Sequence, residues 1–305
     1  MTHRTIDMRV LRVRALVLFV LFLCALVPAV SAQESAPSAT QLAQLLSAIR
    51  AKARTLESSS GMRSGFQTFI TAHKLQSSSV RYQDYVLAHL FFEASRDAGF
   101  WNMHWSITDQ PPNSDRIWHQ WKDARKPSFL KPTAVAECDE LSALYAFLVE
   151  RAGVKGIGLF WPYPNHTVAV WVLRPEARPV LRVVVPTSQI FLTETDTFDT
   201  AKFDPWRQKT IYEYTRRDVP DTFVVPKPLF DFFLQQIDKY GGASETTLQQ
   251  IRNLRDAVFV GTLSPQQAAA EALRLRSSFS TTSAPSEDLA ALQHFADDMR
   301  SAATR

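Results

Sequence analysis

The chain has 305 residues, of which 46% are hydrophobic and 21% are charged. These proportions are ordinary for a folded globular protein, and they exclude collagen, coiled coils and wholesale disorder. The sequence contains no repeat with a period between roughly 20 and 50 residues, which excludes solenoids and propellers. Basic residues number 34 and acidic residues 30, and the position of this small excess decides what it means.

The N-terminus has the three-part pattern of a secretory signal peptide. Most of the first 14 residues are polar and include four arginines, an apolar run extends from Ala15 to Val30, and the run ends in small residues up to Ala32. The run is about 16 residues long, whereas a membrane-spanning helix needs roughly 20. We expect cleavage after Ala32 and a secreted or periplasmic protein without stable membrane insertion. An uncleaved anchor and a lipoprotein attached through Cys24 are the alternatives.

Removal of residues 1–32 changes both the charge and the cysteine content. It takes away four arginines and one aspartate, so the remaining chain has a net charge of +1 and no basic run suited to nucleic acid. Cys138 becomes the single cysteine, which excludes an intramolecular disulfide. A lone thiol in an oxidising compartment is a liability unless it is buried, paired with another chain or used chemically.

Helical spacing of apolar residues predicts two elements in the N-terminal part of the chain. The first helix covers residues 41–56, and the second begins at Tyr82 and ends at Gly99, which we interpret as its C-cap. No element is predicted between them, where Ser and Gly are frequent. Residues 100–137 are rich in Trp and Pro, and we predict a long packed loop with short helices there.

The pattern becomes regular from Cys138 onward. Cys138 begins a predicted helix, with acidic residues in its first turn and an apolar stripe that ends before Gly153. Three short strands are then expected, at residues 157–161, 166–173 and 180–185. After Asp204 the pattern is helical, and the predicted helices cover residues 228–240, 245–258, 265–276 and 287–302. Ser264 and Gln267 form a capping box at the third of these.

Cys138 and His166 form the candidate catalytic pair. A helix N-terminus lowers the pKa of a thiol, so we expect a lowered pKa for Cys138 if it is an activated nucleophile. His166 opens a strand 28 residues further along the chain. A histidine beside the thiol takes its proton and later returns a proton to the leaving group, as acyl transfer requires. The alternative is that Cys138 is a small core residue.

The order of a helix-borne cysteine, a strand, a histidine at a strand start and a final Pro-Thr step resembles the transglutaminase-like branch of the papain-type cysteine peptidase superfamily. The matching segments cover about 50 positions and include residues 137–143, 153–154, 165–170 and 183–187. An exported chain with acids after the cysteine is also similar to the bacterial periplasmic transglutaminase-like cysteine proteinases.

The resemblance implies an α+β fold with a papain/transglutaminase-like core, in which the Cys-bearing helix packs on a small antiparallel sheet. N-terminal helices and a helical C-terminal module complete this fold. The expected division is a signal peptide at 1–32, a leader and N-terminal helix at 33–79, the core at 80–220 and the helical module at 221–305.

Two further site elements follow from the resemblance. Family members usually carry Asp immediately before the Pro-Thr step, where it orients the histidine, but this chain has Val185 there. The candidate replacements are Thr187, Ser188 and Gln189. The family's oxyanion site implies the Cys138 backbone N–H together with an upstream indole, for which Trp105 and Trp101 are candidates, or Gln120 in the papain manner. Packing is the alternative role of the tryptophans.

Two functions from different classes therefore remain open. The first is a cysteine-dependent hydrolase or acyltransferase that acts on a peptide or amide substrate through a Cys138–His166 dyad. The second is a catalytically degenerate fold that serves for binding or scaffolding. We expect a peptide or protein partner rather than nucleic acid, and no cofactor. We identify no His, Asp or Glu pair at i,i+4 spacing that predicts a metal site.

Overall fold

The structure is a computed structural model that describes residues 40–107, 117, 120–121, 126–163, 166–176, 178–188, 212–213, 225–280 and 284–304. Residues 38–305 group into one compact unit. Its described elements make a mixed α+β fold. The predicted signal peptide and Gln189 lie outside the described residues. Within the described part of the chain, no helix is long and apolar enough to cross a membrane.

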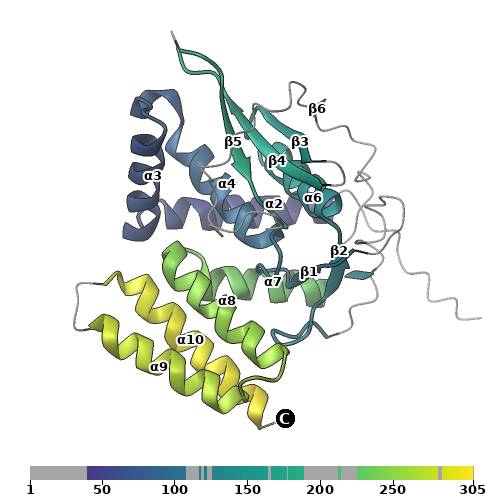
Figure 1. The fold of residues 1–305 in the computed structure, drawn as a ribbon, viewed down its shortest axis with the longest axis vertical. Helices are drawn as coiled ribbons and strands as arrows, with labels where there is room; N and C mark the ends of the chain where they lie inside the picture. The colour runs from purple at the N-terminus through teal and green to yellow at the C-terminus, as the bar shows by residue number, and fades with distance from the viewer. Residues whose placement is uncertain are drawn as a thin grey trace, which may run out of the picture. The chain divides into compact units, whose positions relative to one another are not determined.

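Three helices form the N-terminal part of the described chain: α2 (Thr40–Leu56), α3 (Ser60–Ala72) and α4 (Tyr82–Ser95) (Figure 1). Helix α2 matches its prediction within one residue. Helix α3 was not predicted, because its two glycines and several Ser and Thr residues have low helix propensity. It forms because the Ser59 hydroxyl accepts the backbone N–H of Met62 and because Met62, Phe69 and Ile70 are buried.

The prediction that Gly99 caps the second helix is wrong. Helix α4 ends at Ser95, whose hydroxyl donates to the carbonyl of Phe91, and the chain then turns sharply. A Cβ at position 99 would lie 2.2 Å from the backbone oxygen of Glu93. Gly99 is therefore required by a close approach of the backbone in this turn and not by a helix C-cap.

Two short strands occupy part of the region predicted as a loop with short helices. Strand β1 (Met103–Trp105) pairs in parallel with β2 (Ala134–Ala136). Each has three residues, too few to show the alternation that identifies a strand in a sequence. The side-chain amide of Gln120 bonds both backbone groups of Val135, at 2.9 and 2.8 Å, and so supports β2 from its other side.

The central helix and sheet confirm the prediction for residues 138–185. Helix α6 (Cys138–Arg151) contacts β3 and β4 of an antiparallel sheet with strand order β5-β4-β3-β6. The strands are β3 (Ile157–Tyr163), β4 (His166–Leu173), β5 (Leu181–Val185) and β6 (Tyr212–Glu213). The two faces differ, because Ala169, Trp171 and Val185 join the main core while Val168 and Val170 form a separate apolar cluster with Val184 and Phe160.

Four helices end the chain, and all four were predicted: α7 (Lys227–Tyr240), α8 (Glu245–Phe259), α9 (Pro265–Ser280) and α10 (Ser286–Ala303). The expected capping box is present, since Ser264 N–H donates to the Gln267 side chain and Gln267 N–H donates to the Ser264 hydroxyl. The main core runs without interruption from Leu42 in α2 to Met299 in α10.

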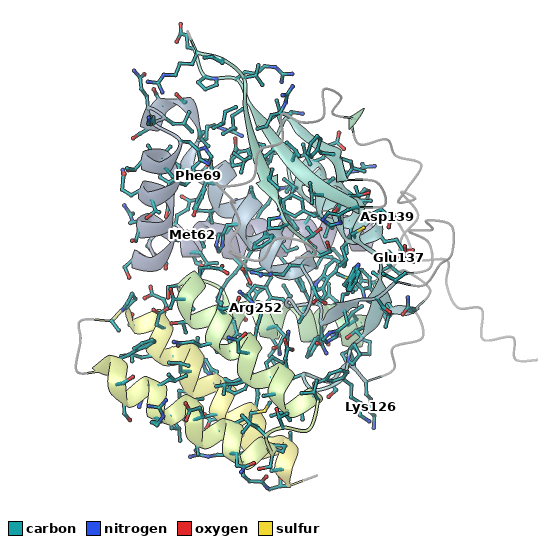
Figure 2. All side chains as sticks on the ribbon, viewed as in Figure 1. Met62, Phe69, Lys126, Glu137, Asp139 and Arg252 are labelled. Carbon is teal, nitrogen blue, oxygen red and sulfur yellow. The ribbon has the colours of Figure 1, made fainter. Side chains whose placement is uncertain are left out.

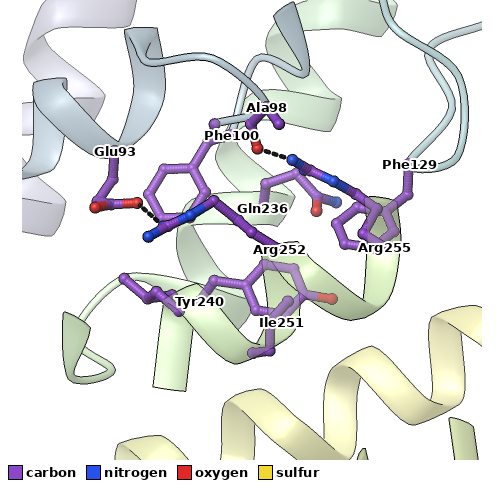
Figure 3. Close-up of a pocket in the computed structure, with 11 residues that line it drawn as sticks. Glu93, Ala98, Phe100, Phe129, Gln236, Tyr240, Ile251, Arg252 and Arg255 are labelled. Carbon is purple, nitrogen blue, oxygen red and sulfur yellow. Dashed lines mark hydrogen bonds and ion pairs between the residues drawn. The ribbon is translucent and has the colours of Figure 1, made fainter. Parts of the chain in front are cut away.

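Buried arginines of α8 connect this helix to the end of α4. Arg252 bonds the carboxylate of Glu93 at 2.9 Å, and Arg255 donates to the carbonyl of Ala98 (Figure 3). Between them lies a cavity of about 20 Å³, which is room for about one water molecule. The side chain of Gln236 from α7 also lines this cavity. Charged hydrogen bonds therefore reinforce the apolar contact between the C-terminal helices and α4.

Candidate active site

Cys138 lies in the first turn of α6, as predicted. Glu137 is the N-cap residue, and its backbone N–H donates to the Glu140 carboxylate at 2.9 Å. Figure 2 labels Glu137 and Asp139 where α6 begins, on either side of the cysteine in the chain. This capping arrangement defines the helix start, so the sulfur lies near the backbone N–H groups that have no partner within the helix. Cys138 is buried, with 7% of its surface exposed.

The thiol is contacted by the strand that carries the candidate histidine. The backbone N–H of Thr167 donates to the Cys138 Sγ at 3.4 Å, and Thr167 directly follows His166. Burial raises the pKa of Cys138, and the nearby Asp139 carboxylate acts in the same direction. The N–H groups of Thr167, Asp139 and Cys138 itself lower the pKa, but less than burial raises it. The resting thiol therefore has a raised pKa and not the lowered pKa that we expect of an activated nucleophile.

His166 begins β4 and is almost completely buried. Burial lowers its pKa to about 4, because the imidazolium form loses its hydration there. At neutral pH the imidazole is consequently uncharged, and the thiol beside Thr167 is uncharged as well. The structure thus places the Cys138 sulfur against the backbone N–H of the residue after His166, and both side chains are uncharged at neutral pH.

Ser142 joins the cysteine-bearing helix to two strands. Its hydroxyl oxygen lies 2.6 Å from the carbonyl oxygen of Cys138, 3.2 Å from that of Thr167 and 2.8 Å from the hydroxyl of Thr187. Ser142 was not singled out from the sequence as a site residue. The sequence pattern that could have identified it is a small polar residue one helical turn after the cysteine, within an otherwise apolar helix face.

The structure separates Val185 from the histidine. Val185 pairs with Ala169, and both belong to the main core. Side chains alternate along a strand, so His166 falls on the face of Val168, opposite to Val185. Among the proposed replacements, Thr187 bonds Ser142, and Ser188 is buried with no hydrogen bond from its hydroxyl within the described residues.

The upstream aromatic candidates have different positions. Trp105 pairs with Ala136, two residues before Cys138, and its backbone N–H donates to the Asp97 carboxylate at 2.8 Å. Its backbone therefore lies beside the strand that leads into α6. Trp101 is buried edge-on against Trp121, with ring centroids 4.2 Å apart, which is a packing role. Gln120 uses its amide to bond strand β2, as described above.

A second cluster of titratable groups was missed in the sequence. His89 and Glu93 are spaced i,i+4 on α4, and the structure adds Glu245 from α8, with one ligand atom of each residue within 4.8 Å of the others. His89 and Glu93 are thus a pair at i,i+4 spacing that the sequence analysis did not single out. The carboxyl groups of Glu93 and Glu245 already accept hydrogen bonds from Arg96 and Arg252.

The comparisons with known proteins add no relative. No family model matches the chain, and no curated protein or solved structure matches it either. The resemblance to the transglutaminase-like branch therefore rests on the residues and element order given above.

Proposed function

We propose that the protein is an exported cysteine-dependent hydrolase or acyltransferase of the transglutaminase-like kind, acting on peptide or amide substrates. The observation that supports this proposal is the contact between the Cys138 sulfur and the N–H of the residue that follows His166. A helix-borne thiol and a strand-borne imidazole belong to adjacent segments in space, although 28 residues separate them in the chain. Acyl transfer by a cysteine requires this pairing of groups.

The proposed reaction uses three groups of the site. The thiol proton moves to His166, and the sulfur attacks the substrate carbonyl carbon to form a C–S bond. The resulting oxyanion is stabilised by the backbone N–H of Cys138 at the α6 N-terminus. Collapse of this intermediate breaks the C–N bond, and His166 protonates the leaving amine. Water or a second amine then takes the acyl group from the sulfur and regenerates the thiol.

A binding or scaffolding role is the second candidate, and the protonation states favour it. Burial raises the pKa of Cys138 and lowers that of His166 to about 4, so proton transfer from thiol to imidazole is unfavourable in the resting protein. Val185 supplies no acid to stabilise the imidazolium. A binding protein that keeps the fold without the reaction needs neither the proton transfer nor the acid.

Acylation of the thiol distinguishes the two candidates. The full chain is incubated with p-nitrophenyl acetate, release of nitrophenolate is followed, and the acylated residue is located by peptide mass spectrometry. The enzyme proposal expects acetyl-Cys138 and turnover that both fall at least tenfold in His166→Ala, which loses the base. The Cys138→Ser variant measures the background rate of nitrophenolate release, including any that results from reaction at Cys24.

The matched control is His104→Ala, because His104 is a partly buried histidine on β1 that the proposed reaction does not use. Each variant's unfolding midpoint is measured to separate loss of chemistry from loss of fold. Equal acylation in the wild type, His166→Ala and His104→Ala, with rates that rise only above pH 9, would reject the enzyme and leave the binding role.

A further inference from the structure

A cavity of about 630 Å³ lies between α3, α4 and the first turns of α8 and α10. Helix α3 lines it with small residues at i,i+4 spacing, namely Ser60, Ser64, Thr68 and Ala72. Helix α4 contributes the side chains of Tyr85 and His89. The volume is in the range of small-molecule sites in proteins. Its wall is therefore partly hydroxyl-bearing and partly apolar, and it reaches the charged cluster described above.

The charged cluster borders this cavity through His89 and Glu245. Glu93 accepts Arg96 at 3.1 Å and Arg252 at 2.9 Å (Figure 3 shows the Arg252 bond). Oε1 of Glu245 accepts the same two arginines, at 3.1 and 2.8 Å. Oε2 of Glu245 is buried and has no donor among the described residues.

Below about pH 7 the two carboxyl groups hold one proton between them. Arg252 and Arg96 overcome the effect of burial at Glu93 and lower its pKa to about 2. Burial and the neighbouring Glu93 carboxylate raise the pKa of Glu245 to about 7, and Glu245 bonds Glu93. Burial lowers the pKa of His89, so its imidazole is neutral. With the proton bound, the two carboxyl groups and two arginines together carry a net charge of +1.

We propose that this cavity binds a primary alkylammonium group at His89 and Glu245, which line it, next to the carboxylate of Glu93. An ammonium group has three N–H donors, and three acceptors placed around it at about 2.8 Å are roughly 4.6 Å apart. The ligand atoms of the three residues lie within 4.8 Å of one another, so they are close enough to share one ammonium group. The carbon chain of the ligand then extends along the Ser64 and Thr68 side of α3.

Charge selects an ammonium ion over other ligands. A monovalent cation in place of the proton leaves the carboxyl–arginine cluster at its net charge of +1. A divalent metal ion would raise that charge to +2, beside two guanidinium groups that it cannot bond. An anion finds no Lys or Arg among the residues that line the cavity, which carry Glu245 and Asp288 instead. The proposal does not depend on the function proposed for Cys138.

The test uses the fact that Glu245 cannot hold its proton and bind the ammonium group at the same time. Binding of n-butylammonium to the full chain is measured by calorimetry at pH 6 and pH 8, with 1-butanol as the neutral probe. The groups that face Glu245 are His89 and Glu93 of α4, Arg96 just after it, Arg252 of α8 and Asp288 of α10, and the pKa of Glu245 itself is raised to about 7. Affinity should therefore rise about tenfold from pH 6 to pH 8, with about one proton released per ligand below pH 7.

Glu245→Gln tests the site directly, because the amide resembles the protonated carboxyl group and keeps the bonds to the arginines through its oxygen. This variant should bind n-butylammonium at least tenfold more weakly and without the pH dependence. Glu287→Gln is the matched control, since it removes a carboxylate next to Asp288 that does not line the cavity. It should bind as the wild type does.

Three results would overturn the proposal. These are affinity that does not change between pH 6 and pH 8, equal binding of 1-butanol, and tighter binding of zinc chloride alone than of n-butylammonium. The last result would indicate a metal site at the same residues. Should Glu245→Gln fail to fold, the pH dependence and the proton release of the wild-type protein still decide the question.

Discussion

Val185→Asp places the family's orienting acid at its usual position, and the structure predicts that it destabilises the protein without assisting His166. Val185 has 0% of its surface exposed and packs in the main core opposite Ala169. Val185→Ala should cost about 2 kcal/mol, since it removes two methyl groups and leaves a cavity. An aspartate loses the same packing and also buries a carboxyl group, so we expect a total cost of at least about 4 kcal/mol at pH 7.

Urea unfolding of the Asp, Asn and Ala variants between pH 3 and pH 8 measures these costs. Burial raises the pKa of an aspartate in the folded state, so Val185→Asp should lose stability relative to Val185→Asn as pH rises above about 4, by roughly 1.4 kcal/mol per unit until the folded-state pKa is reached. Below pH 4 the two variants should converge. The reasoning is refuted if Val185→Asp is as stable as Val185→Ala at pH 7 and speeds acylation of Cys138, since position 185 would then face His166.

Three further predictions concern the connection between α4 and α8. Arg252→Met should lower the free energy of unfolding by about 3 kcal/mol, because Glu93 then loses a buried partner, whereas Arg274→Met at an exposed ion pair should leave the urea midpoint unchanged. Gly99→Ala should cost about 3 kcal/mol in the same assay, because its Cβ would meet the Glu93 backbone oxygen at 2.2 Å. Glu245 has a raised pKa of about 7, so its protonation stabilises the fold and this stabilisation is lost as pH rises from about 4.5 to 7. Glu245→Gln should therefore gain stability relative to the wild type over that range, and a constant difference would contradict the assignment.

The elements that the sequence predicts well are those with a strong apolar period. Helix α6 and strands β3, β4 and β5 were predicted within two residues, because their apolar residues are buried in the main core or in the smaller clusters beside it. Helix α3 was missed because the residues on its cavity-facing side are small and mostly polar, so this side shows no helical period of apolar residues. Strands β1 and β2 have too few residues to show a period. The contact that stabilises these two strands is made between residues about 30 positions apart in the chain.

The candidate site could be predicted only in part, for a related reason. The positions of Cys138 and His166 follow from a helix start and a strand start, which are local features. Their protonation states do not follow from local features, because the burial that sets them depends on how the helix and the sheet pack. The role of Ser142 also depends on the position of Thr187, which is 45 residues away in the chain. The spacing of His89 and Glu93 was visible, but its meaning required Glu245 from a distant helix.

The two buried sites of this protein differ in the groups that are available to stabilise a negative charge. At Glu93, two guanidinium groups lie within 3.1 Å, so the carboxylate keeps its charge although it is buried. At Cys138 the stabilising groups are backbone N–H dipoles, and they are too weak to offset burial. An ion pair between Cys138 and His166 would therefore have to be stabilised by something that arrives with the substrate, such as the polar carbonyl on which charge develops. Reactivity of the thiol should then depend on the acyl donor more strongly than on pH, whereas a spectator thiol would follow its own pKa alone.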